Sequence, residues 1–323
     1  MKVVVLDDWQ GAVANLACLT LLEGHELTIL GDREREPEEV ERVLREVEAL
    51  VPIRERTAVT AAFLGGLPRL RLIAQTGRGT AHVDLAACAR RGVAVSAGEG
   101  SPVAPAELTF GLILAALRNI PHEAAGLRSG RWQETMGTAL HGRTLGILGY
   151  GAIGALVASY GAAFGMRVAV WGREGSRSRA LADGHAVATD REALCSDADV
   201  LSLHLKLTAE TRGLVTASDL ARMKPTALLV NTARAELIEP GALARALRAG
   251  RPGLAAVDVF EREPASPGEE PLLGLDNALC TPHLGFVERD TYERYFGDAF
   301  ARVAAFAAGE GIPVLAPEAL ESR

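Results

Sequence analysis

Residues 143–154 read RTLGILGYGAIG, and this stretch decides the fold. The apolar run TLGILGY predicts a buried strand, and the apolar segment from Ala152 onward predicts a helix. Between them Gly149, Gly151 and Gly154 form the pattern G-x-G-x-x-G. In this pattern the first glycine permits a tight turn, the second lets a pyrophosphate approach the backbone, and the third lets the helix pack closely on the strand. The stretch therefore predicts a dinucleotide-binding unit, with a glycine-rich turn that binds no ligand as the alternative.

The next strand pattern, MRVAVWG, ends without the acidic residue that many such units carry. Gly172 lies 18 residues after Gly154, near the position where an Asp or Glu binds the adenosine ribose of NAD. Arg173 follows directly, and an arginine grips phosphate where a carboxylate would repel it. We therefore expect NAD or NADP as the cofactor and favour NADP. The alternative is an exposed basic turn in which Glu174 binds the ribose hydroxyl.

Apolar runs alternate with helical patterns along most of the chain. Strands are expected at KVVVLDD, HELTIL, EALVPI and RLRLIAQT in the first part, and at MRVAVWG, ADVLSLHL, ALLVNTA and LAAVDVF after the glycine turn. Such alternation predicts parallel strands joined by right-handed crossovers. Because the second series is nearly all apolar, its strands are expected to be covered on both faces. The predicted fold class is therefore α/β, with two doubly wound Rossmann-like domains.

Two helix patterns stand where the chain is expected to change domain. The first is SPVAPAELTFGLILAALRNI, with Ser101 and Pro102 as its cap and first turn. The second begins near residue 286 and leads to GIPVLAPEAL. The cleft between two domains is the default place for a binding site. The predicted domains are a discontinuous substrate-binding domain, residues 1–99 and 286–323, and an inserted cofactor-binding domain, residues 100–285.

The composition restricts the kind of protein. The 323 residues carry a formal net charge of −7, which argues against binding to nucleic acid or to a membrane surface. No apolar run reaches the roughly 18 residues of a membrane span, and MKVVVLDD does not have the pattern of a signal peptide. The cysteines Cys18, Cys88, Cys195 and Cys280 are not spaced as metal ligands. We therefore expect a cytoplasmic protein with reduced thiols and no metal site.

Three polar residues follow apolar segments of the second series: Arg234 after ALLVNTA, Glu263 after AAVDVFER, and His283 within CTPHLG. Because the carboxyl ends of parallel strands meet at one edge of a sheet, we expect these side chains to converge beside the cofactor. An arginine can bind a carboxylate and polarise a ketone, a histidine can give a proton to the carbonyl oxygen, and a carboxylate can orient the imidazole. Taken singly, the three also fit a helix cap, a turn residue and a buried histidine.

These motifs in this order resemble the D-isomer-specific 2-hydroxyacid dehydrogenase family, in particular its 3-phosphoglycerate dehydrogenase and glyoxylate/hydroxypyruvate reductase branches. The matching segments are HGRTLGILGYGAIG, FGMRV, LVNTARAELIEPGALARALRAG, AAVDVFEREP and TPHLG. The resemblance implies hydride transfer between NAD(P)(H) and a small D-2-hydroxy acid or 2-oxo acid, with Arg234, Glu263 and His283 as catalytic residues. It also implies a homodimer. The alternative is a dimeric corepressor-like protein that senses NAD(P)(H), since such relatives can keep the same three residues.

The resemblance further implies that TGRGTAHVD holds the substrate carboxylate, with Arg78 and Gly79 as the candidate contacts. The family commonly has V-D-N before the last two residues of this loop, whereas this chain has T-A-H ending at His82. This departure leaves the particular acid open. Ala235 stands where the family usually has glycine, and Lys206 where it commonly has proline. No role is assigned to Lys206 or His82.

The cofactor is expected to contact the glycine turn, the end of the following strand and the ends of further strands in the second domain. For His204 in LHLKLT, both a structural role and a place beside the cofactor remain open, and His283 is the expected acid/base. The predicted cofactor contacts are Gly149, Tyr150, Gly151, Ala152, Ile153, Gly154, Gly172, Arg173, His204, Thr232, Ala233 and Asp258.

Overall fold

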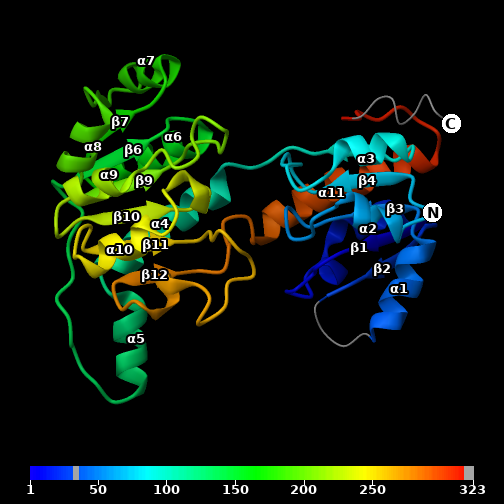
Figure 1. Cartoon of the computed structure of the whole chain (residues 1–323), viewed down its shortest axis with the longest axis horizontal. Helices are drawn as coiled ribbons and strands as arrows, with labels where there is room; N and C mark the ends of the chain where they lie inside the picture. The colour runs from blue at the N-terminus through cyan, green and yellow to red at the C-terminus, as the bar shows by residue number, and fades with distance from the viewer. Residues whose placement is uncertain (32–35, 316–323) are drawn as a thin grey trace. The chain divides into compact units, whose positions relative to one another are not determined.

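The computed structural model describes residues 1–31 and 36–315, so the end of the predicted GIPVLAPEAL segment lies outside the described residues. The chain divides into two compact units (Figure 1). Unit 1 comprises Met1–Ser101 and the chain from Glu288 onward, and unit 2 is Pro102–Val287. The division of substrate and cofactor binding between the two units stays a prediction.

Unit 1 is built on a parallel sheet with the strand order β2-β1-β3-β4-β5. Its strands are β1 (Lys2–Val5), β2 (Glu26–Ile29), β3 (Ala49–Val51), β4 (Leu72–Gln75) and β5 (Ala94–Ala97). Its helices are the 3-10 turns η1 (Val13–Asn15) and η2 (Ala17–Leu22), then α1 (Pro37–Glu46), α2 (Ala61–Gly65), α3 (Leu85–Arg90) and α11 (Arg289–Ala307).

Helices pack on the sheet of unit 1 through spaced apolar residues. In α1 the side chains of Val40, Val43 and Leu44 share one helix face and pack against the buried cluster under β1, β3 and β4. In α11 the fully buried Phe296 and Phe300 are four residues apart, and their rings lie 5.4 Å from each other. This helix packs on β4 and η2, so the chain from Glu288 onward completes the core of unit 1.

Unit 2 is built on a second parallel sheet with the order β12-β11-β10-β9-β6-β7-β8. Its strands are β6 (Thr144–Leu148), β7 (Arg167–Trp171), β8 (Ala186–Val187), β9 (Val200–Leu203), β10 (Leu228–Asn231), β11 (Leu254–Val257) and β12 (Ala278–Cys280). Its helices are α4 (Val103–Leu117), α5 (Ile120–Arg128), α6 (Ala152–Ala163), α7 (Glu174–Ala182), α8 (Arg191–Asp197), α9 (Ala217–Arg222) and α10 (Ala242–Arg248), with the 3-10 turns η3 (Ala235–Leu237) and η4 (Pro271–Gly274).

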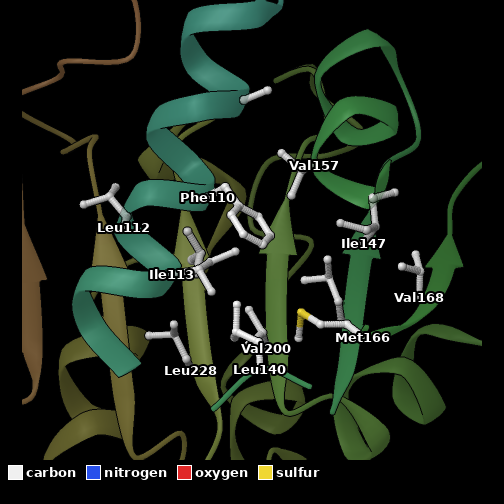
Figure 2. Packing of buried hydrophobic residues seen from close by; sticks show 14 of the residues in the cluster. Phe110, Leu112, Ile113, Leu140, Ile147, Val157, Met166, Val168, Val200 and Leu228 are labelled. Atoms are coloured by element: carbon white, nitrogen blue, oxygen red, sulfur yellow. The ribbon is translucent and has the colours of Figure 1, made fainter. Parts of the chain in front are cut away.

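Both faces of the unit 2 sheet are covered, as the apolar strands predict. Helices α4 and α6 pack with the sheet into one buried cluster, and α8, α9 and α10 pack into another. Figure 2 shows α4 packed against the strands, with Phe110 and Ile113 directed into the first cluster. Two parallel sheets with flanking helices make this an α/β, Rossmann-like fold, which confirms the predicted fold class.

The helix expected over residues 101–120 is broken in the structure. α4 ends at Leu117, Asn119 takes the left-handed conformation with φ of 51°, and α5 begins at Ile120. The N-cap of α4 is Pro102, one residue after the predicted cap Ser101. In the described part of the chain no single helix is long and apolar enough to cross a membrane, although α4 and α5, bent by 60°, pass that test together.

Candidate active site

The glycine turn after β6 lies where the strand order of unit 2 reverses. β6 pairs with β7 on one side and with β9 on the other, and ligands of such sheets bind at the carboxyl ends of these strands. Gly149 has φ of 98°, and a Cβ there would lie 2.9 Å from the carbonyl of His204. A Cβ on Gly154 would meet the carbonyl oxygen of Gly149. The folded turn therefore requires glycine at both positions.

Protein packing does not account for glycine at position 151. Gly151 is the N-cap of α6, and the N–H groups of the first turn, which includes Ala152 and Ile153, receive no side-chain cap. A Cβ at Gly151 would meet nothing within 4 Å among the described residues. A ligand that approaches the backbone would account for the glycine, and the free N–H groups of the helix favour an anion. The turn thus fits the pyrophosphate of a dinucleotide.

Tyr150 supports the same turn from its buried side. Its hydroxyl donates to Asp183 Oδ2 at 2.7 Å, and Arg179 Nη2 donates to the Tyr150 carbonyl at 2.8 Å. Burial, together with the hydrogen bond and charge of Asp183, raises the pKa of Tyr150 to about 12. The side chains of Tyr150 and Arg179 therefore hold the loop in place, and neither was assigned this role from the sequence.

Gly172 and Arg173 stand next to the glycine turn at the end of β7. A Cβ on Gly172 would lie 3.8 Å from the Cα of Gly149 and 3.3 Å from the Cβ of Ser176. Arg173 is the N-cap of α7, and its side chain is 78% exposed and lies 3.4 Å from Glu210. Exposed ion pairs contribute little, so Glu210 restrains Arg173 only weakly.

The turn after β10 carries Arg234 and is fixed by Asn231. The side chain of Asn231, a residue 1% exposed, donates to the Arg234 carbonyl at 2.8 Å and accepts from the Ala233 N–H at 3.1 Å. Thr232 Oγ1 lies 2.6 Å from Thr109 Oγ1 of α4. Asn231 was not among the residues predicted from the sequence, although an amide at the end of the apolar run LLVN is a signal of such a role.

His283 and Glu263 form the central pair of the candidate site. His283 Nδ1 lies 2.7 Å from Glu263 Oε2, and Glu263 Oε1 accepts from the Phe260 N–H at 3.0 Å. Burial acts to raise the pKa of Glu263, but the hydrogen bond and charge of His283, the Phe260 N–H and the charge of Arg234 together lower it. The structure therefore places the three predicted catalytic residues within electrostatic reach of one another.

Asp258 lies beneath the loop that carries His283. It is fully buried, and it accepts hydrogen bonds from Thr281 Oγ1 at 2.6 Å, the Leu284 N–H at 2.7 Å and the Gly285 N–H at 2.9 Å. Burial raises the pKa of Asp258, although these bonds and the charge of His283 oppose the rise. His283 itself has φ of 52°. Asp258 thus holds the loop around a left-handed residue, and its predicted contact with the cofactor stays a prediction.

His204 packs behind the glycine turn at the end of β9. Its Nε2 lies 2.8 Å from Ser202 Oγ, and its backbone N–H donates to the Leu148 carbonyl. Burial lowers the pKa of His204 to about 4. A histidine that is neutral near pH 7 and packed against the glycine turn suits a structural role better than proton transfer.

In unit 1, Arg78 and Gly79 lie on the loop after β4. The Arg78 side chain is exposed, and no described residue forms an ion pair or hydrogen bond with it. Glu55 lies against Gly79, and neither ring nitrogen of His82 has a hydrogen-bond partner among the described residues. Glu55 was not predicted from the sequence, because no local pattern relates it to this loop. Lys206 is exposed, and the structure gives it no role.

Within the described ranges, no group of three or more His, Cys, Asp or Glu side chains is arranged to hold a metal ion. The fold and the side chains at its strand ends define an α/β protein with a dinucleotide-type glycine turn and a histidine–carboxylate pair. Residues 110–285 match the family model described as "D-isomer specific 2-hydroxyacid dehydrogenase, NAD binding domain". The chain belongs to the D-isomer specific 2-hydroxyacid dehydrogenase family.

Relatives support this assignment over most of the chain. The chain is 39% identical to the glyoxylate reductase of Aeropyrum pernix over 281 residues, which cover 84% of this chain and 83% of that protein. It is also 39% identical to the D-3-phosphoglycerate dehydrogenase of Methanocaldococcus jannaschii over 251 residues, 77% of this chain but only 47% of that protein. The chain thus spans about half the length of that relative. A solved oxidoreductase structure from Ralstonia solanacearum is 50% identical, with a TM-score of 0.94 over 99% of this chain and 98% of that one.

Proposed function

We propose that the chain is an NAD(P)-dependent oxidoreductase that transfers a hydride between the nicotinamide and a small D-2-hydroxy acid or 2-oxo acid. The observation that carries this proposal is the 2.7 Å pair of His283 Nδ1 and Glu263 Oε2, with the charge of Arg234 acting on the same carboxylate. An arginine, a carboxylate and a histidine are the groups that such a reaction needs. Family membership supports the same class of chemistry.

In this mechanism each of the three side chains has one task. Arg234 binds the substrate carboxylate and draws electron density toward the carbonyl oxygen. His283 donates a proton from Nε2 to that oxygen as the ketone becomes an alcohol, and it takes the proton back in the oxidation direction. Glu263 accepts the Nδ1–H, which fixes the orientation of the ring and stabilises its charged form. The bound nicotinamide supplies or accepts the hydride.

The chain's own residues fit a dinucleotide at the glycine turn. The N–H groups at the start of α6 would hold the pyrophosphate, and the freedom of Gly151 from protein neighbours fits a ligand at that place. At the ribose, the absence of an acid at Gly172 and the weakly restrained Arg173 support NADP, and Glu210 beside Arg173 supports NAD. We favour NADP, with NAD as the alternative.

We also propose a homodimer formed through unit 2. The apolar α4 is largely buried in its own unit, which leaves it little surface for a partner. Exposed apolar side chains instead lie on α5 and on the segment after it, which extend away from the sheet of unit 2 (Figure 1). They are Ile120, Leu127, Trp132 and Met136. Sedimentation velocity is expected to show a dimer at micromolar concentration, and a monomer would reject this part of the proposal.

The function is tested by following absorbance at 340 nm with NADH and with NADPH against a panel of 2-oxo acids. Glyoxylate, hydroxypyruvate, 3-phosphohydroxypyruvate and a branched 2-oxo acid cover the substrate types considered for the chain. Turnover of any of them, lost in His283→Ala while cofactor binding persists, supports the proposal. Cofactor binding with no turnover on the whole panel would reject the enzyme and favour a nucleotide sensor.

A further inference from the structure

Arg54 and Glu55 follow β3, at the place where the strand order of unit 1 reverses. β1 is flanked by β2 and β3 in the order β2-β1-β3-β4-β5, and ligands of a sheet with this order bind at the carboxyl ends of β1 and β3. The loop with Gly77 and Gly79 follows the neighbouring strand, β4. The fold therefore brings the segment after β3 and the candidate carboxylate loop to the same edge of the sheet.

The backbone around Arg54 is fixed to the buried end of β4. The Arg54 N–H donates to Thr76 Oγ1 at 2.8 Å, and Gln75 Nε2 donates to the Arg54 carbonyl at 2.9 Å. Thr76 and Gln75 are fully buried, and Arg54 has φ of 53°. A left-handed arginine held by two buried partners sets the direction in which the next residue, Glu55, leaves the chain.

The side chains of Arg54 and Glu55 both lie against the glycines of the candidate loop. A Cβ on Gly79 would lie 2.5 Å from Glu55 Oε1 and 3.8 Å from Arg54 Nη2, and a Cβ on Gly77 would meet Arg54 Nη1. The Arg54 guanidinium also lies over the ring of Tyr295, 5.5 Å from its centroid. Glu55 is therefore not a free surface carboxylate: it stands beside the backbone that is expected to receive the substrate.

The candidate loop carries one exposed arginine beside the Arg54–Glu55 pair. Arg54 and Glu55 are adjacent and carry opposite charges, and they act on His82 in opposite directions. Arg78 is exposed and has no ion-pair partner among the described residues, so its positive charge suits one carboxylate. A second anionic group that approached Gly79 would meet the Glu55 carboxylate, and like charges at short range repel.

We propose that Glu55 determines substrate specificity by excluding a second anionic group, so that the substrates are 2-oxo acids with one carboxylate and an uncharged side chain. This inference rests on the proposed oxidoreductase function. The proposed substrate class excludes phosphorylated acids, such as the one in the name of the D-3-phosphoglycerate dehydrogenase of Methanocaldococcus jannaschii. The residue acts on substrate choice, and the hydride and proton transfers stay with the residues of unit 2.

The test compares hydroxypyruvate with 3-phosphohydroxypyruvate, which differ only in the phosphate ester. In the wild-type protein, kcat/KM for hydroxypyruvate is expected to exceed that for the ester at least tenfold. Glu55→Gln keeps the shape of the side chain and removes its charge. The ratio of kcat/KM for hydroxypyruvate to kcat/KM for the ester is therefore expected to shrink at least tenfold. Glu55→Asp keeps the charge and is expected to retain a preference for hydroxypyruvate.

Glu23→Gln is the matched control. Glu23 is exposed and precedes the amino end of β2, at the opposite edge of the sheet from the candidate loop, so its loss changes the net charge equally without touching the loop. The ratio is expected to stay unchanged in this variant. Circular dichroism checks the fold of every variant.

Three results would overturn the inference. The first is a wild-type protein with equal kcat/KM for the ester and for hydroxypyruvate. The second is a ratio of the two kcat/KM values that Glu55→Gln leaves unchanged. Loss of the preference in Glu55→Asp to the same extent as in Glu55→Gln would show that shape and not charge is responsible. Turnover of 2-oxo acids distinguishes these failures from failure of the proposed function, in which neither substrate nor any other 2-oxo acid is reduced.

Discussion

Replacing Glu263 with glutamine tests how the carboxylate acts on His283. Glu263 uses both oxygens, since Oε2 faces His283 Nδ1 at 2.7 Å and Oε1 accepts from the Phe260 N–H at 3.0 Å. Glutamine offers only one acceptor oxygen, so one of these bonds is lost whichever way the amide is turned. The negative charge opposite the imidazole is lost in both orientations. The Glu263→Gln enzyme is therefore expected to orient the ring poorly and to stabilise its protonated form less.

The size of the effect follows from the geometry. A hydrogen bond to a charged group contributes roughly 1.5–3 kcal/mol. The side chains of His283 and Glu263 are 25% and 32% exposed, so solvent screens the pair and the lower part of that range applies. A loss of about 1.5–2 kcal/mol in the transition state corresponds to a fall in kcat of about 13- to 30-fold.

The loss of kcat is expected over the whole range from neutral to alkaline pH. Burial acts to raise the pKa of Glu263, but the hydrogen bond and charge of His283 and the Phe260 N–H hold it below its ordinary value. The wild-type carboxylate is therefore charged at neutral pH, where the glutamine of the variant is not, so kcat of the variant is expected to stay below that of the wild-type enzyme at each pH in this range.

The assay is steady-state absorbance at 340 nm with saturating cofactor and 2-oxo acid, from about pH 5.5 to 9. Glu261→Gln is the matched control. Glu261 is exposed on the same loop, and its replacement removes the same charge. Cofactor affinity, followed by fluorescence, is expected to stay within about twofold in both variants. A Glu263→Gln enzyme with kcat within twofold of wild type over the whole pH range would refute the reasoning.

Three further predictions concern other residues of unit 2. Arg234→Ala is expected to lower kcat/KM by about 10²–10⁴-fold with effects on both kcat and KM, and an unchanged value would contradict its role. Gly172→Asp, whose Cβ would lie 3.3 Å from that of Ser176, is expected to shift the ratio of kcat/KM toward NADH by about tenfold or more; an unchanged ratio counts against a ribose contact. The pKa of His204 is about 4 in the folded protein, against about 6.5 in the unfolded chain. Between these pH values the unfolded chain binds one more proton, so the free energy of unfolding falls as pH drops, by up to about 3 kcal/mol. Urea unfolding of His204→Asn is expected to lose this part of the pH dependence, and an unaltered slope would argue against burial of the ring.

Most of the strands were predictable because their signals are local, whereas β5, β8 and β12 were not among the predicted strands. The run TLGILGY, the three glycines and the following apolar helix appear in the structure as β6, the turn and α6. The break at Asn119 was not predicted, although the sequence carries a local signal for it. Asn119 is a residue type that adopts the left-handed conformation readily, and Pro121 lies in the first turn of α5.

The catalytic candidates were predictable as a set, and their supports were not. His283 and Glu263 are twenty residues apart, and the prediction that they converge follows from their places after parallel strands; the structure gives their distance as 2.7 Å. The bonds from Asp258 to the His283 loop, and from Asn231 to the Arg234 turn, depend on which backbone groups are left without partners in the folded state. No sequence pattern identifies which backbone groups these are.

The sequence by itself determined the α/β class, the glycine turn, and the identity of the residues at the strand ends, because each depends on a few neighbouring residues and on the period of a strand or helix. The tertiary structure decided what those residues touch. It packed His204 against the glycine turn, left the space beside the Cα of Gly151 open, and set Glu55 against Gly79. These contacts join segments distant in sequence, and their burial and electrostatics follow only from the packing of the whole unit.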